Sequence, residues 1–182
     1  MRNFVRHMMA GKDTFLYFGY GSNLLKERIR INSPTAQFKA VGKVQDYQLG
    51  FYGFWSRWGG GVATINPAPG HTLWGVVWQI GIENLEALNK QEGVKDNDQG
   101  VYRPVELSVK TSTGENLTCR SYQIIDTSQP NPPSPQYMEV LLGGARQQGL
   151  PEEYIQELSK IQTNDYKGPV QIMEDLKKNN KS

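Results

Sequence analysis

The sequence has very few residues of the kinds that build disulfides and metal centres. Among its 182 residues there is one cysteine, Cys119, and there are two histidines, His7 and His71. A disulfide needs two cysteines, and a zinc site needs a cluster of cysteine or histidine ligands. The sequence therefore excludes an intrachain disulfide and predicts no metal site. Cys119 lies in an alternating stretch and is expected to be a small core residue rather than a nucleophile.

An excess of one charge and long apolar runs are also missing. Lysine and arginine number 20 against 18 acidic residues, so the formal net charge is +2. So balanced a chain predicts no strong attraction to nucleic acid or to an anionic membrane. No apolar run approaches the ~20 residues of a membrane helix, and Arg6 and His7 interrupt any signal-peptide core. A soluble cytoplasmic protein is expected, with the basic run Lys177, Lys178 and Lys181 as a solvated tail.

The usual nucleophile and nucleotide motifs are absent as well. There is no Gly-x-Ser-x-Gly elbow, and two histidines supply no convincing catalytic triad. Gly59-Gly60-Gly61 is not followed by Gly-Lys-Ser/Thr, so it predicts no phosphate loop, and the dinucleotide fingerprint is missing. Any chemistry must therefore depend on carboxylates and on backbone donors.

The hydrophobic pattern predicts one domain over residues 14–182, after a flexible N-terminus over residues 1–13. We expect strands at about 14–20, 42–54, 61–65 and 72–80, and a hairpin of 102–110 with 116–125. Helices are expected at about 24–31, 82–91, 136–148, 151–161 and 169–178, with a proline-rich linker over 130–135. This order predicts an α+β fold in which a mixed, mostly antiparallel sheet curls into a β-barrel flanked by helices.

Two short segments carry candidate chemistry. Gly19-Tyr20-Gly21-Ser22-Asn23 joins a strand to a helix, and its small residues would let backbone N–H groups approach a carboxylate or an oxyanion. Ser22 or Asn23 is also placed to cap that helix, which is the commoner role of such a turn. Glu92 ends a short helix before Gly93, where the helix dipole would raise the pKa of its carboxyl and suit a general base. A solvated glutamate is the ordinary alternative.

Read together, these segments resemble the γ-glutamylcyclotransferase family. The resemblance rests on Phe15-Leu16-Tyr17-Phe18-Gly19-Tyr20-Gly21-Ser22-Asn23-Leu24-Leu25 and Leu88-Asn89-Lys90-Gln91-Glu92-Gly93-Val94. It continues through Trp74 to Trp78, Cys119 to Tyr122, Pro133 to Tyr137, Gly144-Ala145, Gly149 to Pro151 and Asn164 to Tyr166. The motifs follow in family order and cover nearly the whole chain from about Phe15 to Tyr166.

The resemblance implies a compact barrel enzyme, usually a homodimer, that converts γ-glutamyl-amino acids into 5-oxoproline and the free amino acid without a cofactor or metal. It implies that Glu92 is the catalytic acid/base. It also implies a substrate-binding set, which comprises Tyr17, Phe18, Gly19, Tyr20, Gly21, Ser22, Asn23 and Tyr137. Tyr102 and Tyr122 are further candidates for bonds to substrate, although tyrosines in strands more often pack half-buried.

The sequence departs from the family pattern in three places. Gly19 stands where better-known members carry alanine, which should loosen the loop slightly. Asn89-Lys90 replaces an acidic pair, and Lys90 would lower the pKa of Glu92 if it came close. The segment Gly53 to Gly59 is unusual, and its Trp55, Arg57 and Trp58 would either line the site and influence specificity or lie in an exposed turn.

Two other functions stay open at the level of sequence. Related folds carry out cyclotransfer on γ-glutamyl-ε-lysine or on glutathione, but with different residues after the Tyr-Gly pair. An inactive member of the fold could serve as a binding module, but it would have no chemical reason to keep both Glu92 and the complete loop.

Overall fold

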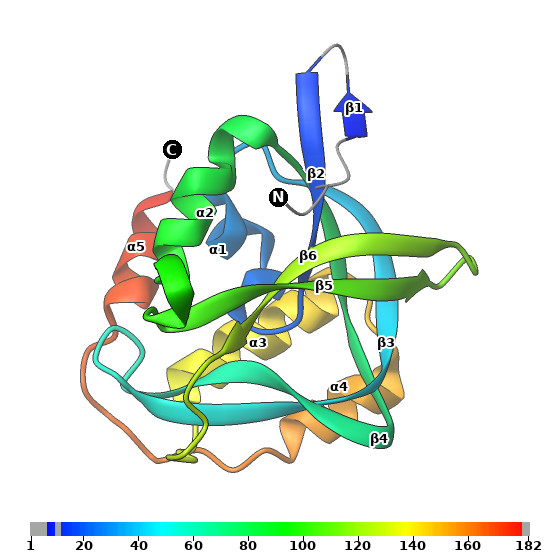
Figure 1. The fold of residues 1–182 in the computed structure, drawn as a ribbon. Helices are drawn as coiled ribbons and strands as arrows, with labels where there is room; N and C mark the ends of the chain where they lie inside the picture. Colours follow the sequence, from blue (N-terminus) through cyan, green and yellow to red (C-terminus); the bar gives the residue numbers. More distant parts are fainter. Residues whose placement is uncertain (1–6, 10–11, 180–182) are drawn as a thin grey trace.

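A computed structural model describes residues 7–9 and 12–179 (Figure 1). Five of its strands close into a mixed β-barrel, in the order β2 (Lys12–Gly19), β4 (Gly60–Gly81), β3 (Gln37–Trp55), β5 (Tyr102–Thr111) and β6 (Asn116–Ile124). All neighbours are antiparallel except β2 and β6, whose parallel contact closes the barrel. The α+β barrel with flanking helices is confirmed.

Strand β2 closes the barrel, because it pairs with β4 on one side and with β6 on the other. Aromatic residues have high strand propensity, and Phe15 and Phe18 of this strand are completely buried. Trp78 of β4 pairs with Tyr17 and is itself completely buried. The core inside the barrel therefore lies directly behind the loop that follows Gly19.

The predicted strands over 61–65 and 72–80 are two parts of a single strand, β4, so the predicted turn between them is wrong. The intervening segment still belongs to β4 and runs beside β3, with Pro67 opposite Tyr47 and Thr72 opposite Gln45. The register shifts between these pairs, so Ala68 to His71 lie opposite Asp46 alone, and Gly70 has φ 83°. A bulge at Asp46, whose φ is 64°, lets β3 follow this bend, and the Asp46 carboxylate accepts the Gly70 N–H at 2.8 Å. Prolines are tolerated in a strand where no ladder N–H is required, so they do not mark a turn here.

The hairpin, the linker and the helices lie close to their predicted positions. Strands β5 and β6 form the expected hairpin around Gly114, and the linker ends at Ser134, whose side chain caps α3 by accepting the Tyr137 N–H at 3.0 Å. The longer helices are α2 (Leu85–Gln91), α3 (Pro135–Gln147), α4 (Glu152–Ser159) and α5 (Gln171–Asn179). The shorter ones are η1 (Ser22–Leu24), α1 (Lys26–Arg30), η2 (Ile82–Asn84) and η3 (Asp96–Asp98). Figure 1 shows α1, α2 and α5 gathered on one side of the barrel.

The N-terminal segment differs from the prediction where it is described. His7–Met9 form β1, which pairs with the start of β2, and β2 begins at Lys12 rather than at residue 14. Residues 1–6 and 10–11, also predicted to be flexible, lie outside the described residues, as do residues 180–182 of the predicted basic tail. Cys119 is completely buried, and burial raises the pKa of its thiol to about 12, which confirms a core role.

Helix α3 packs closely against the loop after β2 through one glycine. A Cβ atom on Gly144 would lie 2.3 Å from the backbone nitrogen of Leu25 and 2.6 Å from the carbonyl carbon of Leu24. Backbone atoms cannot yield easily, so only glycine permits this approach. On the neighbouring Gly143, the nearest atom to an added Cβ would be 4.0 Å away.

We predict that Gly144→Ala destabilises the protein by about 1–3 kcal/mol, because overpacking outweighs the better helix propensity of alanine. Gly143→Ala is the matched control in the same helix, and it should raise stability by up to ~1 kcal/mol. Thermal unfolding of both variants checks this expectation. Equal melting temperatures for the two variants would show that α3 does not depend on close contact with the loop.

Candidate active site

The loop after β2 is fixed by the core beneath it. Following Gly19, the chain turns through Tyr20 and Gly21 into η1, and the Asn23 carbonyl accepts the indole N–H of Trp78 at 2.9 Å. The expected helix begins only at Lys26, with Leu25 at its N-cap and no side-chain cap. Neither Ser22 nor Asn23 caps it, so that prediction is wrong. Asn23 instead turns its side chain toward the end of α2.

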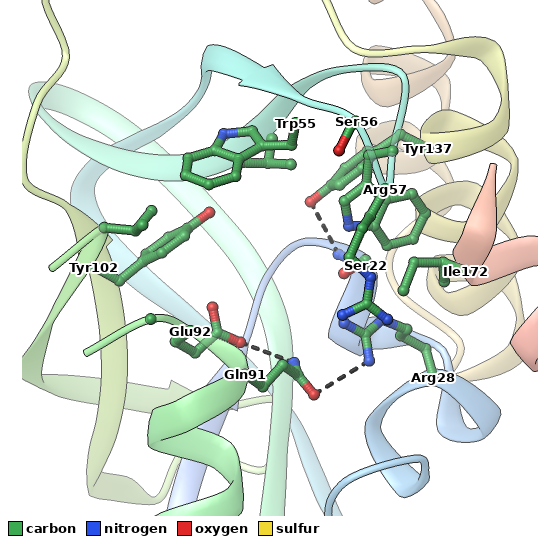
Figure 2. A pocket seen from close by; sticks show the side chains of 14 residues that line it. Ser22, Arg28, Trp55, Ser56, Arg57, Gln91, Glu92, Tyr102, Tyr137 and Ile172 are labelled. Atoms are coloured by element: carbon green, nitrogen blue, oxygen red, sulfur yellow. Dashed lines mark hydrogen bonds between the residues drawn. The ribbon is translucent and has the colours of Figure 1, made fainter. Parts of the chain in front are cut away.

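Glu92 occupies the C-cap of α2, and its N–H donates to the Leu88 carbonyl at 3.1 Å. Gly93 follows with φ 62°, the left-handed conformation that ends many helices, so the predicted stop is confirmed. This geometry directs the Glu92 side chain toward the loop at Ser22 and Asn23 (Figure 2).

The Glu92 carboxylate is held in a hydrogen-bonded chain of side chains. Its Oε1 accepts from Gln91 Nε2 at 2.9 Å and from Asn23 Nδ2 at 3.2 Å. Asn23 Nδ2 also donates to the Tyr17 hydroxyl at 2.9 Å. On the other side, Gln91 Oε1 accepts from Arg28 Nη1 at 3.1 Å. Four elements, β2, η1, α1 and α2, thus meet at one carboxylate.

Burial raises the pKa of Glu92 above its ordinary value, since low polarity disfavours the charged form. The positive charge of Arg28, followed by the hydrogen bonds from Gln91 and Asn23, opposes this rise. The direction expected from sequence is therefore correct, but burial rather than the helix dipole is its main cause. The cation that lowers the pKa of Glu92 is Arg28 and not Lys90, which is exposed on the outer side of α2.

Tyrosine hydroxyls surround the same carboxylate. Tyr137 Oη accepts the backbone N–H groups of Ser22 and Ala63, each at 3.3 Å, so its own proton is available to a further acceptor. Tyr102 donates to the Ala63 carbonyl at 2.6 Å, and Tyr20 donates to the Tyr122 carbonyl. Burial raises the pKa of these hydroxyls, so all remain protonated at neutral pH.

Two cavities meet at Glu92. The inner one, of about 40 Å³, is lined by the loop and the tyrosines. Its lining residues are Tyr17, Tyr20, Gly21, Ser22, Asn23, Ala63, Glu92, Tyr102, Tyr122 and Tyr137. The outer cavity, of about 330 Å³, shares Ser22, Glu92, Tyr102 and Tyr137 with it and opens between Trp55 and Arg28 (Figure 2). Its other lining residues are Ser56, Arg57, Trp58, Val62, Gln91, Gly93, Val101 and Ile172.

The structure brings together most of the residues that sequence reasoning selected, including both possible ones, Tyr102 and Tyr122. Two do not join them. Phe18 is completely buried on the core side, with its carbonyl accepting from Ser121 at 2.8 Å, and lines neither cavity. Gly19 lines neither cavity, and a Cβ atom added to it would lie 3.2 Å from the Asn23 carbonyl oxygen, so there is little spare room here for an alanine.

Sequence reasoning missed Arg28, Gln91, Val62 and Ile172 as lining residues. Arg28 gave one signal, since it is a charged residue on the apolar, inward side of the helix predicted over 24–31. The unusual segment Gly53 to Gly59 is no detached turn, because Trp55, Arg57 and Trp58 all line the outer cavity.

Within residues 7–9 and 12–179, no group of three or more histidine, cysteine or carboxylate side chains could hold a metal ion. No helix in the same part of the chain is both long and apolar enough to cross a bilayer.

Comparison with known proteins gives a consistent result. A sequence model of the AIG2-like family matches residues 72–158. The mouse γ-glutamylcyclotransferase is 46% identical over 175 residues, covering 93% of this chain and 91% of the mouse protein. The bovine γ-glutamylcyclotransferase is 48% identical over 176 residues, covering 93% and 92% of the two chains. A solved structure of a γ-glutamyl cyclotransferase is 43% identical with a TM-score of 0.83, covering 91% of this chain and 99% of the other.

The raised pKa of Glu92 predicts a pH-dependent cost to folding. A carboxyl whose pKa is higher in the folded state destabilises the fold above that pKa, and the cost disappears as pH falls below the unfolded value of ~4.3. Glu92→Gln keeps the shape and removes the charge. It should melt at or above the wild-type temperature at pH 8, with the difference shrinking toward pH 4. A variant that is markedly less stable at pH 8 would mean that the charged carboxylate stabilises the fold.

Proposed function

This chain belongs to the γ-glutamylcyclotransferase family, and from that premise we propose that it converts γ-glutamyl-amino acids into 5-oxoproline and the free amino acid. One observation carries the proposal: the Glu92 carboxyl faces the loop at Ser22 and Asn23 where two cavities meet. This places one acid/base group beside a small polar cavity and a larger outer cavity. A γ-glutamyl-amino acid has the matching form, with a small charged head and a variable leaving group.

Glu92 transfers protons from the attacking nitrogen to the departing nitrogen. The α-amine of the substrate has an ordinary pKa near 8, is mostly protonated at neutral pH, and must lose a proton before it can attack the γ-carbonyl carbon. Glu92 accepts that proton, and the freed amine attacks to form the new C–N bond that closes the five-membered ring. Glu92 then gives the proton to the departing nitrogen as the old C–N bond breaks. The ring nitrogen still carries one extra proton after the attack, and it releases this proton to the ionised Glu92, which passes it to the released amine or to solvent. A carboxyl whose pKa is raised by burial suits both directions of transfer.

Confinement assists the ring closure. The attacking amine and the γ-carbonyl belong to the same molecule. Holding the glutamyl chain in a folded pose therefore lowers the entropic part of the activation barrier. The inner cavity is bounded by Gly21, Ser22 and five tyrosines. Tyr17 accepts from Asn23 and so keeps its own proton for the glutamyl α-carboxylate, whereas Tyr20, Tyr102 and Tyr122 already donate theirs to other acceptors. Because Gly21 has no Cβ, the Tyr137 hydroxyl reaches this wall: an added Cβ would lie 2.8 Å from it.

The developing negative oxygen needs a donor, and we assign that role first to the Tyr137 hydroxyl. The loop amides are the alternative, but the Ser22 N–H already donates to Tyr137 Oη. Two N–H groups bonded to Tyr137 Oη polarise its O–H and make it a stronger donor. The amides would then stabilise the oxyanion through the phenol rather than directly.

Replacing the proposed base tests the mechanism. We predict that Glu92→Gln lowers 5-oxoproline formation from γ-glutamyl-alanine by about 10²–10⁴-fold, the usual contribution of a general acid/base. Glu86→Gln is the matched control, because Glu86 is an exposed carboxylate on the same helix. Amine release measured by chromatography is the readout. Undiminished turnover by Glu92→Gln would remove Glu92 from the mechanism.

The choice of substrate is tested separately. With γ-glutamyl-alanine, γ-glutamyl-ε-lysine and glutathione at equal concentrations, we expect the highest kcat/KM for γ-glutamyl-alanine. Preference for either of the other two would overturn the assignment to γ-glutamyl-amino acids. A well-folded protein that turns over none of them would instead support an inactive binding module of the same fold.

We further propose a cytoplasmic enzyme of glutathione metabolism and the γ-glutamyl cycle that works as a homodimer without a cofactor. Support for the location comes from the single buried cysteine, which forms no intrachain disulfide. The homodimer rests on family resemblance alone, and size-exclusion chromatography with light scattering would decide it.

A further inference from the structure

The outer cavity contains a pair of arginines that the proposed chemistry does not use. Arg28 comes from α1 and Arg57 from the segment between β3 and β4, and both line the cavity near Ser22 (Figure 2). Burial lowers the pKa of Arg28, the charge of Glu92 opposes this shift, and the charge of Arg57 adds a smaller lowering, which indicates that the two guanidinium groups interact. Two like charges that face one space repel each other, and an anion between them would relieve that repulsion.

Arg28 has an unmet bonding requirement. Only 5% of Arg28 is exposed, and its Nε atom is buried with no hydrogen-bond partner in the described structure. Nη1 donates to Gln91, and the guanidinium lies 5.8 Å from the centre of the Trp58 ring. A buried N–H without an acceptor costs about 1–3 kcal/mol. Nε itself is shielded, so the donors that Arg28 offers to a ligand are other N–H groups of the same guanidinium, since Arg28 lines the cavity.

The Arg57 side chain is mostly exposed, and among the described residues it has one ion-pair partner. Its Nη2 lies 3.4 Å from Asp175 Oδ2 on α5. A guanidinium has five N–H donors, so this contact leaves others for a ligand. The anionic groups nearby are Asp175 at the rim and Glu92 at the base, and neither forms an ion pair of 4.0 Å or less with Arg28 among the described residues.

We propose that Arg28 and Arg57 bind the free carboxylate of the leaving amino acid, and that they select substrates whose scissile nitrogen belongs to an α-amino acid. This inference rests on the proposed cyclotransfer reaction. Glu92 must reach the departing nitrogen, and Arg28 is linked to Glu92 through a single residue, Gln91.

In a γ-glutamyl-α-amino acid, the carboxylate stands on the carbon bonded to that nitrogen, ~2.5 Å from it by standard bond lengths. In γ-glutamyl-ε-lysine the carboxylate is instead at the far end of the lysine side chain. An uncharged amide at the same position would lose the charge-assisted bonds.

The decisive comparison pairs one substrate change with one protein change. Wild-type protein should favour γ-glutamyl-alanine over γ-glutamyl-alaninamide by about tenfold or more in kcat/KM, as expected for charge-assisted bonds. Arg57→Gln should reduce that preference severalfold while leaving kcat/KM for the amide substrate nearly unchanged. Arg103→Gln is the matched control, because Arg103 is also exposed with one carboxylate partner, Asp98 at 4.0 Å, but lies outside the cavity. Arg28→Lys, which keeps the charge near Glu92, should also reduce the preference.

Binding to Glu92→Gln, measured by calorimetry, separates this inference from the proposed reaction. Suppose that γ-glutamyl-alanine binds more tightly than its amide but the wild type forms no 5-oxoproline. That result would overturn the proposed reaction and support the carboxylate site. Equal binding of the two would overturn the carboxylate site whatever the turnover. Equal loss of kcat/KM on both substrates in Arg57→Gln would overturn it as well, since the residue would then act only on structure.

Discussion

The burial of one carboxylate determines how this end of the molecule is arranged. Removing the charge of Glu92 from water is unfavourable, and the fold offsets that cost with two side-chain hydrogen bonds and one nearby cation. The donors come from Gln91 on α2 and Asn23 on η1, and the cation from Arg28 on α1. Each donor is positioned by a further contact: Asn23 by the Trp78 indole at its carbonyl, and Gln91 by the Asn32 amide at 2.9 Å. The barrel wall, the loop and the two helices are therefore coupled through Glu92.

This coupling explains why the sequence predicted some features and not others. Barrel strands follow from local alternation and aromatic content, and the stop of α2 follows from Gly93, since these signals depend on neighbours along the chain. Asn23 looked like a helix cap for the same local reason. Its side chain instead bonds Glu92 and Tyr17, and a partner 69 positions away cannot be found from local pattern. Tertiary contact also overrides the turn signal of Pro67 to Gly70, which the long ribbon of β3 and β4 accommodates.

The residues of the site were selected by resemblance, whereas their geometry required the fold. Glu92, Ser22 and Tyr137 come from segments far apart in sequence, and composition alone assigns them ordinary structural roles. Only the assembled barrel places the Tyr137 hydroxyl within hydrogen-bond reach of Ser22 and Ala63. The absence of a side chain at Gly21 permits the close approach of Tyr137. The absence of a side chain at Gly144 likewise permits α3 to pack against the backbone of the loop. Such close approaches depend on contacts between distant segments, which a sequence alone does not show.

The two cavities are lined by elements of different rigidity. The inner one is built from β2, η1 and the tyrosines, whose hydroxyls are bonded to backbone groups or to asparagine side chains, so any substitution there disturbs several contacts at once. Arg57 and Asp175 at the outer rim are partly exposed and joined by a single ion pair, which contributes little to stability. A change at the rim can therefore alter which leaving group fits without moving Glu92. The position of the Glu92 carboxylate is fixed by the core, while the selectivity that we propose depends on Arg57, an exposed side chain held by one ion pair.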